Sequence, residues 1–163
     1  MASAPEPPSL EDMASSALKA FAQVAVLAGS PYDLDLIKVE IRLRPHRAPT
    51  RLPAGQMAVY AFFHQGRALK VGKVGPNSGP RFTSQHYNPN SARSNLARSL
   101  LQGTAVIDGM ERDELTIGSW ILKNTDRVNL LLPARAGMPL LTLLEAFLHV
   151  RWMPMFEGRT QEI

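Results

Sequence analysis

Hydrophobic residues recur at helical spacing near the start of the chain, from Leu10 to Leu27. Ser9 is typical of an N-cap and Gly29 of a helix end, so the pattern predicts one helix between them. From 37 to 43, apolar and charged residues then alternate with a period of two. This alternation predicts a strand with one buried face.

The middle of the chain predicts a β-hairpin. Two apolar runs, 57–63 and 68–74, are separated by Gln65 and Gly66, and glycine tolerates the positive φ that a two-residue turn requires. Beyond the hairpin we expect helices over 81–87, 92–102 with a Ser91 cap, 113–123 and 139–152, and a buried strand over 128–132. The expected fold class is α+β, with a small, mainly antiparallel sheet of about three to four strands flanked by helices.

The composition indicates one globular domain. The chain has 163 residues, of which 45% are hydrophobic and 20% charged, and it lacks cysteine, which excludes disulfides, thiolate chemistry and iron–sulfur clusters. No apolar run reaches the ~18 residues that span a bilayer, and no basic start precedes an apolar stretch as in a secretory signal. We expect a cytoplasmic protein without a membrane partner, with a disordered tail over 1–9 and a single domain over 10–163.

The net charge of +4 conceals a concentrated basic segment. Residues 38–99 contain eleven lysines and arginines and one acid, Glu40, whereas the segments on either side are net acidic. Such a positive field fits a polyanion, most simply a nucleic acid. The alternatives are a basic face that serves solubility and a surface for an acidic protein partner. The residues expected to contact nucleic-acid phosphates are Arg42, Arg44, Lys73, Arg93 and Arg98.

The hairpin contains short sequence motifs that indicate a specific function. Its first strand contains Ala58-Val59-Tyr60 and its second contains Lys70-Val71-Gly72. Arg81 opens the next expected helix, and Glu145 lies in a distant apolar helix. In this order, over about residues 57–157, the chain resembles the GIY-YIG nuclease superfamily. The resemblance implies a DNA endonuclease that hydrolyses phosphodiester bonds with the help of a divalent metal ion.

The resemblance also implies roles for individual residues. It makes Tyr60 the general base or the residue that positions the attacking water, Arg81 a phosphate ligand, and Glu145 the ligand of Mg²⁺ or another divalent cation. Lys70 stands where the family usually has tyrosine, and it would hold the water or a phosphate oxygen. Neighbouring strands lie about 4.8 Å apart, so the Lys70 ammonium is also expected to lower the pKa of Tyr60. His86, one residue beyond the family's histidine position, is a further candidate.

The surroundings of Glu145 single it out independently. It shares a narrow polar stripe with Thr142 and His149 on an otherwise apolar helix. A carboxylate among so much apolar surface must be paired, exposed to water or bound to a metal. A single carboxylate suits Mg²⁺, which keeps most of its waters and takes further oxygens from substrate phosphate.

We therefore expect a metal-dependent DNA endonuclease. A homodimer is compatible with this interpretation, because an enzyme that cuts a palindromic site needs two copies. The alternative is a non-catalytic nucleic-acid-binding module on a decayed nuclease scaffold. That alternative is favoured by the lysine at 70, the displaced histidine at 86 and the lack of the family's asparagine in the segment 154–158.

Overall fold

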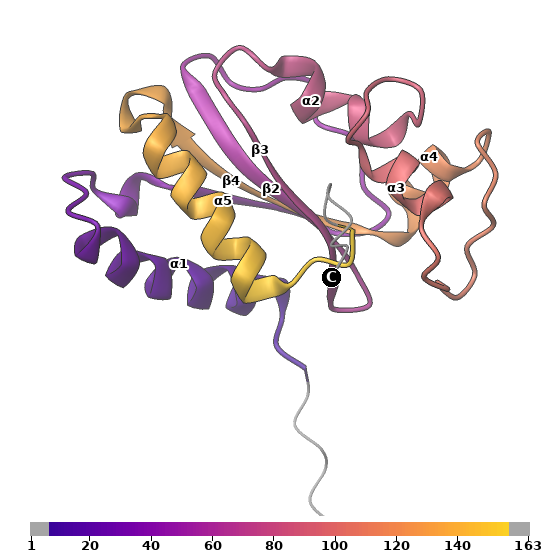
Figure 1. Cartoon of the computed structure of the whole chain (residues 1–163), viewed down its shortest axis with the longest axis horizontal. Coiled ribbons are helices and arrows are strands. Elements are labelled where there is room, and N and C mark those ends of the chain that lie inside the picture. Colours follow the sequence, from indigo (N-terminus) through magenta and orange to yellow (C-terminus); the bar gives the residue numbers. More distant parts are fainter. Residues whose placement is uncertain (1–6, 157–163) are drawn as a thin grey trace, which may run out of the picture.

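The computed structural model describes residues 7–156 and contains a four-stranded antiparallel sheet with helices on both faces (Figure 1). The strands are β1 (Lys38–Arg42), β2 (Gln56–His64), β3 (Arg67–Val74) and β4 (Asp126–Pro133). The helices are α1 (Leu10–Leu27), α2 (Gly79–Thr83), α3 (Leu96–Gln102), α4 (Ile117–Asn124) and α5 (Met138–Trp152). Short 3₁₀ turns lie at Leu34–Leu36, Gln85–Tyr87 and Ala134–Ala136. The α+β fold class is confirmed.

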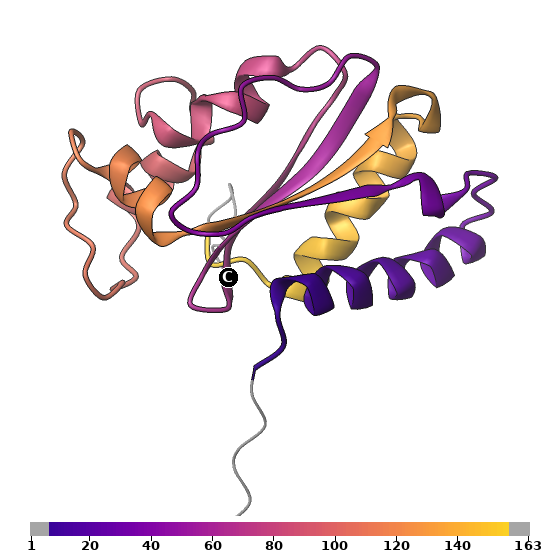
Figure 2. The same cartoon turned by 180° about the vertical axis from the view of Figure 1, so that it is seen from behind.

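The strand order β1-β4-β2-β3 places the hairpin at one side of the sheet and β1 at the other edge. Helices α1 and α5 pack on one face, and α2, α3 and α4 gather on the opposite face, as Figure 1 and the reverse view in Figure 2 show. Strands β2 and β4 are therefore buried on both faces, which explains their nearly continuous apolar runs. Strand β1 is more exposed: Val39 is exposed and Ile41 is only half-buried, so the expectation of one buried face is wrong for this strand.

Local signals predicted several elements well. The Ser9 hydroxyl accepts a hydrogen bond from the Asp12 amide at 3.1 Å and caps α1 as expected. The hairpin turn is also confirmed, with Gln65 at φ 49° and Gly66 at φ 76°. Both φ values are positive, as a tight two-residue hairpin turn requires. Residues 1–6 of the expected tail and residues 157–163 of the expected domain lie outside the described residues.

The expected helix over 92–102 is wrong at its start. Helix α3 begins at Leu96, and its cap is Asn95, whose Oδ1 accepts from the Arg98 amide at 2.7 Å. The Asn95 side-chain amide also donates to the carbonyl of Ala92 at 2.7 Å, which fixes the preceding residues as a loop. The Ser91 hydroxyl donates to loop carbonyls instead of capping a helix.

Two other helices are shorter than expected. The segment 81–87 is divided into α2, which already begins at Gly79, and a separate 3₁₀ turn that buries His86. The segment 113–123 begins with a turn closed by the Asp113 carbonyl, so that α4 starts only at Ile117. In both cases short-range hydrogen bonds tighten the chain where the apolar pattern alone allowed a continuous helix.

Candidate active site

Tyr60 lies opposite Gly72 in the β2–β3 pair, with its side chain fully buried on the face that α2, α3 and α4 cover. A Cβ atom on Gly72 would overlap the Tyr60 hydroxyl, so the phenol ring reaches across the strand only because residue 72 is glycine. The irregularity in this hairpin falls between Phe62 and Phe63 and leaves Gly72 regularly paired. Gly72 thus permits the close approach of Tyr60 and does not form a β-bulge.

Arg81 contacts the hydroxyl of Tyr60. It lies in the first turn of α2, and its Nε donates to the Tyr60 hydroxyl at 3.3 Å. Burial raises the pKa of Tyr60, while the charges of Arg81 and Arg127 oppose that rise. The expectation of a lowered pKa for Tyr60 is therefore wrong, because burial outweighs the neighbouring positive charges. Tyr60 is a neutral phenol in the resting protein.

Lys70 and His86 lie on the same side of the sheet. Lys70 pairs with Phe62 in the hairpin register and is only 3% exposed. The His86 ring packs against Tyr60 at a centroid distance of 4.6 Å. Burial, followed by the charges of Arg127, Lys70 and Arg81, holds the pKa of His86 well below 6.5, so its imidazole is neutral.

The tautomer of His86 follows from its hydrogen bond. Its Nδ1 accepts from the Leu96 amide at 3.2 Å, which leaves the proton on Nε2. Within residues 7–156, Nε2 is buried and has no hydrogen-bond partner. His86 is therefore a neutral N–H donor with an unused proton, and it packs directly against the Tyr60 ring.

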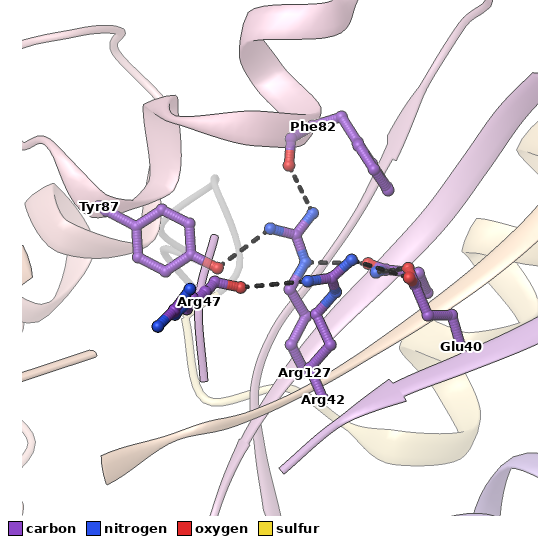
Figure 3. A network of polar contacts seen from close by, with 7 residues as sticks. Glu40, Arg42, Arg47, Phe82, Tyr87 and Arg127 are labelled. Atoms are coloured by element: carbon purple, nitrogen blue, oxygen red, sulfur yellow. Dashed lines mark hydrogen bonds and ion pairs between the residues drawn. The ribbon is translucent and has the colours of Figure 1, made fainter. Parts of the chain in front are cut away.

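A fully buried arginine lies behind these residues. Arg127 on β4 donates to the carbonyl of Phe82 at 2.7 Å, the hydroxyl of Tyr87 at 3.1 Å and the side-chain oxygen of Asn129 at 2.8 Å (Figure 3). Its guanidinium carbon also lies 5.4 Å from the centre of the Tyr60 ring. None of its three acceptors is a carboxylate, so its positive charge persists in the interior beside the candidate site.

The sequence pattern does not predict a role for Arg127, because this residue precedes the apolar run that predicts β4. The available signal was Asn129, a polar residue in the middle of that buried strand. Its side-chain amide donates to Glu40 at 2.8 Å, and Glu40 in turn pairs with Arg42 at 2.8 Å. The one acid of the basic segment therefore belongs to this network, and so does Arg42, a predicted phosphate contact.

Glu145 lies on α5, which packs along β3 on the other face of the sheet. Its carboxylate forms an ion pair with Lys73, another predicted phosphate contact. In the same polar stripe, His149 Nε2 lies 3.1 Å from the Val71 carbonyl, so the stripe faces β3. The charge of Glu145 acts to raise the pKa of Tyr60, which shows that the two groups interact electrostatically.

The remaining predicted phosphate contacts lie on the side of the sheet that carries Tyr60 or at its edge. Arg93 is exposed in the loop before α3, and Arg98 is half-buried within α3. Arg44 follows β1 and lies 3.5 Å from Asp126. The structure thus brings Tyr60, Lys70, Arg81 and His86 together, and it leaves the five predicted phosphate ligands dispersed.

Glu145 is the one residue that the sequence predicts as a metal ligand. In the part of the chain that the structure describes, no group of three His, Asp or Glu side chains is placed to hold a metal ion. A single carboxylate still fits a Mg²⁺ that keeps most of its waters, provided that Lys73 releases it.

None of the helices within residues 7–156 is long and apolar enough to cross a membrane. Comparison with models of protein families, with curated proteins and with solved structures finds no match to this chain.

Proposed function

We propose that this protein is a metal-dependent endonuclease of the GIY-YIG type that hydrolyses phosphodiester bonds of DNA in the cytoplasm. The observation that supports this best is the environment of one hydroxyl. The Tyr60 hydroxyl crosses Gly72 and accepts a hydrogen bond from Arg81, and a neutral imidazole and a buried arginine pack against its ring. Donors and positive charges gathered in a water-poor site suit a reaction that develops negative charge on phosphate oxygens.

The position of each site residue indicates its role in the proposed reaction. Arg81 is half-buried and charged, and it would bind a phosphate oxygen while it holds the Tyr60 hydroxyl. Because burial keeps Tyr60 protonated, its first role would be to orient the attacking water, and proton transfer would require the substrate complex to shift its pKa. Glu145 is the residue that would hold Mg²⁺, which supplies charge neutralisation at the phosphate when bound.

A plasmid-nicking assay with Mg²⁺ tests this proposal. The wild-type protein should nick supercoiled DNA, and Tyr60→Phe and Glu145→Gln should each lose most of that activity while they keep the fold. Matched controls are Tyr32→Phe and Glu111→Gln, because both residues lie outside the candidate site. No cleavage by folded wild-type protein across Mg²⁺ and Mn²⁺ concentrations would refute the proposal.

Two observations favour the alternative, a nucleic-acid-binding module without catalysis. Lys73 already forms an ion pair with Glu145, which competes with metal binding by this carboxylate. Burial opposes ionisation of Tyr60, so this hydroxyl is a poor general base in the resting protein. Such a module would bind duplex DNA with an affinity that falls steeply as salt rises, because bound lysines and arginines release counterions from phosphates. A DNA affinity that falls steeply with salt, without any nicking, would support this alternative. A DNA affinity that salt does not change would exclude both the nuclease and the binding module.

A further inference from the structure

Strand β1 is the open edge of the sheet. Within the described residues it pairs on one side only, with β4. At the opposite edge, β3 is partly covered, because the Met155 amide donates to the Ala68 carbonyl and the Phe156 amide to the Leu69 carbonyl. In Figure 2, β1 lies at the near edge of the sheet with α1 below it. A free strand edge is a template for pairing with another chain.

The space beside this edge has an apolar floor and charged residues at its sides. A groove of about 640 Å³ runs between α1 and β1, and its floor includes Leu18, Ile37, Val39 and Ile41. Val39 is 43% exposed, and Leu43, just beyond the strand on the same face, is 57% exposed. Apolar side chains that alternate along an unpaired edge gain from a partner strand, since cross-strand pairs are the unit of sheet stabilisation.

The sequence of the edge is complementary to itself in one antiparallel register. If Ile41 lies opposite Ile41 of a second copy, Val39 lies opposite Leu43, and these apolar pairs share the face that lines the groove. On the other face, Glu40 lies opposite Arg42, twice by symmetry. From 39 to 43, each apolar residue meets an apolar residue and Glu40 meets Arg42. At the ends of this register Lys38 meets Arg44, whose charge is partly offset within its own copy by Asp126, 3.5 Å away.

We propose that two copies of this chain pair along β1 about a twofold axis at Ile41, which joins their sheets into one. The order of charged residues along β1 favours a second copy of this chain over an unrelated strand as the partner. Lysines and arginines on an edge normally discourage pairing, yet Glu40 gives the centre of this edge an acid that faces Arg42 of a second copy. Within each copy Glu40 already pairs with Arg42. In the dimer the two Glu40 carboxylates and the two Arg42 guanidinium groups would therefore form one network in which negative and positive charges alternate.

Helix α1 extends the interface. A strand pair alone falls short of the roughly 1,200 Å² that a specific interface buries. The α1 side that lines the groove carries Glu11 and Lys19, opposite charges eight residues apart on one helix. A twofold axis makes the two α1 helices antiparallel on the same face of the joined sheet, which allows Glu11 of one copy to face Lys19 of the other.

Sedimentation velocity over about 1–200 µM, a range that spans typical weak interfaces, tests this dimer. Wild type should shift from monomer to dimer as its concentration rises. Glu40→Arg places two arginines opposite each other in the paired strands, and Arg42→Glu places two glutamates opposite each other, so each should weaken dimerisation about tenfold or more. Mixed together, the two variants should form a heterodimer, because both cross-strand pairs then restore attraction: one copy presents two arginines and the other two glutamates. Glu111→Arg and Arg67→Glu make the same charge changes at exposed positions outside β1 and should dimerise as wild type does.

Leu43→Lys gives a test that does not disturb the Glu40–Asn129 contact. Leu43 is exposed, so the variant should keep the circular dichroism and melting behaviour of the folded protein while it loses the dimer. The proposal is overturned if wild type stays monomeric throughout, or if its dimer tolerates all three β1 variants. It is also overturned if the folded Glu40→Arg and Arg42→Glu proteins fail to combine. These outcomes require no DNA and no cleavage, so they are independent of the proposed nuclease activity.

Discussion

Gly72→Ala is the sharpest test of the site's geometry, because it adds one methyl group under the Tyr60 ring. That Cβ would lie 2.7 Å from Cζ and 3.1 Å from Cε2 of Tyr60, and closer still to the hydroxyl. These separations are below van der Waals contact, and the aromatic ring cannot bend, so the ring or the strand must move. The movement should withdraw the Tyr60 hydroxyl from Arg81.

The magnitude follows from two effects. Overpacking a well-packed core costs about 1–3 kcal/mol. Loss of the hydrogen bond adds about 1 kcal/mol, less than is usual for a charged donor because Arg81 is half-exposed. The free energy of unfolding should therefore fall by about 2–4 kcal/mol, which in a domain of this size lowers Tm by roughly 4–16 °C.

Thermal and urea unfolding followed by circular dichroism measure this change. Gly79→Ala is the matched control, since a Cβ there meets nothing within 4 Å. The double variant Gly72→Ala/Tyr60→Phe should be less destabilised than the sum of the two single changes, because phenylalanine removes the atom that overlaps most. A Gly72→Ala protein within about 0.5 kcal/mol of wild type, the range of an unremarkable surface change, would refute the placement of Tyr60 over Gly72.

Three further predictions concern the groups around this pair. Lys73→Met should lower the Mg²⁺ concentration that half-saturates cleavage, because it removes the cation that competes for Glu145; a Mg²⁺ titration of the nicking rate measures it, and a higher requirement would contradict the competition. Arg127→Met should lower the free energy of unfolding by at least about 2 kcal/mol, because three acceptors, two of them buried, lose their donor; a loss under about 1 kcal/mol in urea would show that the network is dispensable. Burial holds the pKa of His86 well below 6.5 in the folded state, so the unfolded chain binds the proton more readily and stability should fall as pH drops below about 6.5. Urea unfolding at a series of pH values measures the slope of stability against pH. His86→Phe should reduce this slope by an amount equivalent to about one bound proton, and His46, whose pKa burial also lowers, should account for the slope that remains. An unchanged slope in His86→Phe would show that His86 does not bind the proton.

The sequence by itself determined the elements whose signals are local. Ser9 caps α1 through a contact three residues away, and the turn at Gln65 and Gly66 closes the hairpin through its own φ values. The paired hairpin strands put Tyr60 beside Gly72, so this half of the candidate site was predictable once the hairpin was recognised. Periodicity and turn chemistry act within a few residues, and one sequence contains them in full.

Other features depended on packing between distant parts of the chain. The Lys73–Glu145 ion pair joins residues 72 positions apart, and Asn129 reaches Glu40 across 89 positions. Whether burial or a neighbouring charge decides the pKa of Tyr60 depends on how tightly three helices cover one face of the sheet. Arg127 is the extreme case: an arginine before an apolar run is usually a solvated strand end. Only the placement of β4 in the middle of the sheet, under Phe82 and Tyr87, turned it into a buried charge.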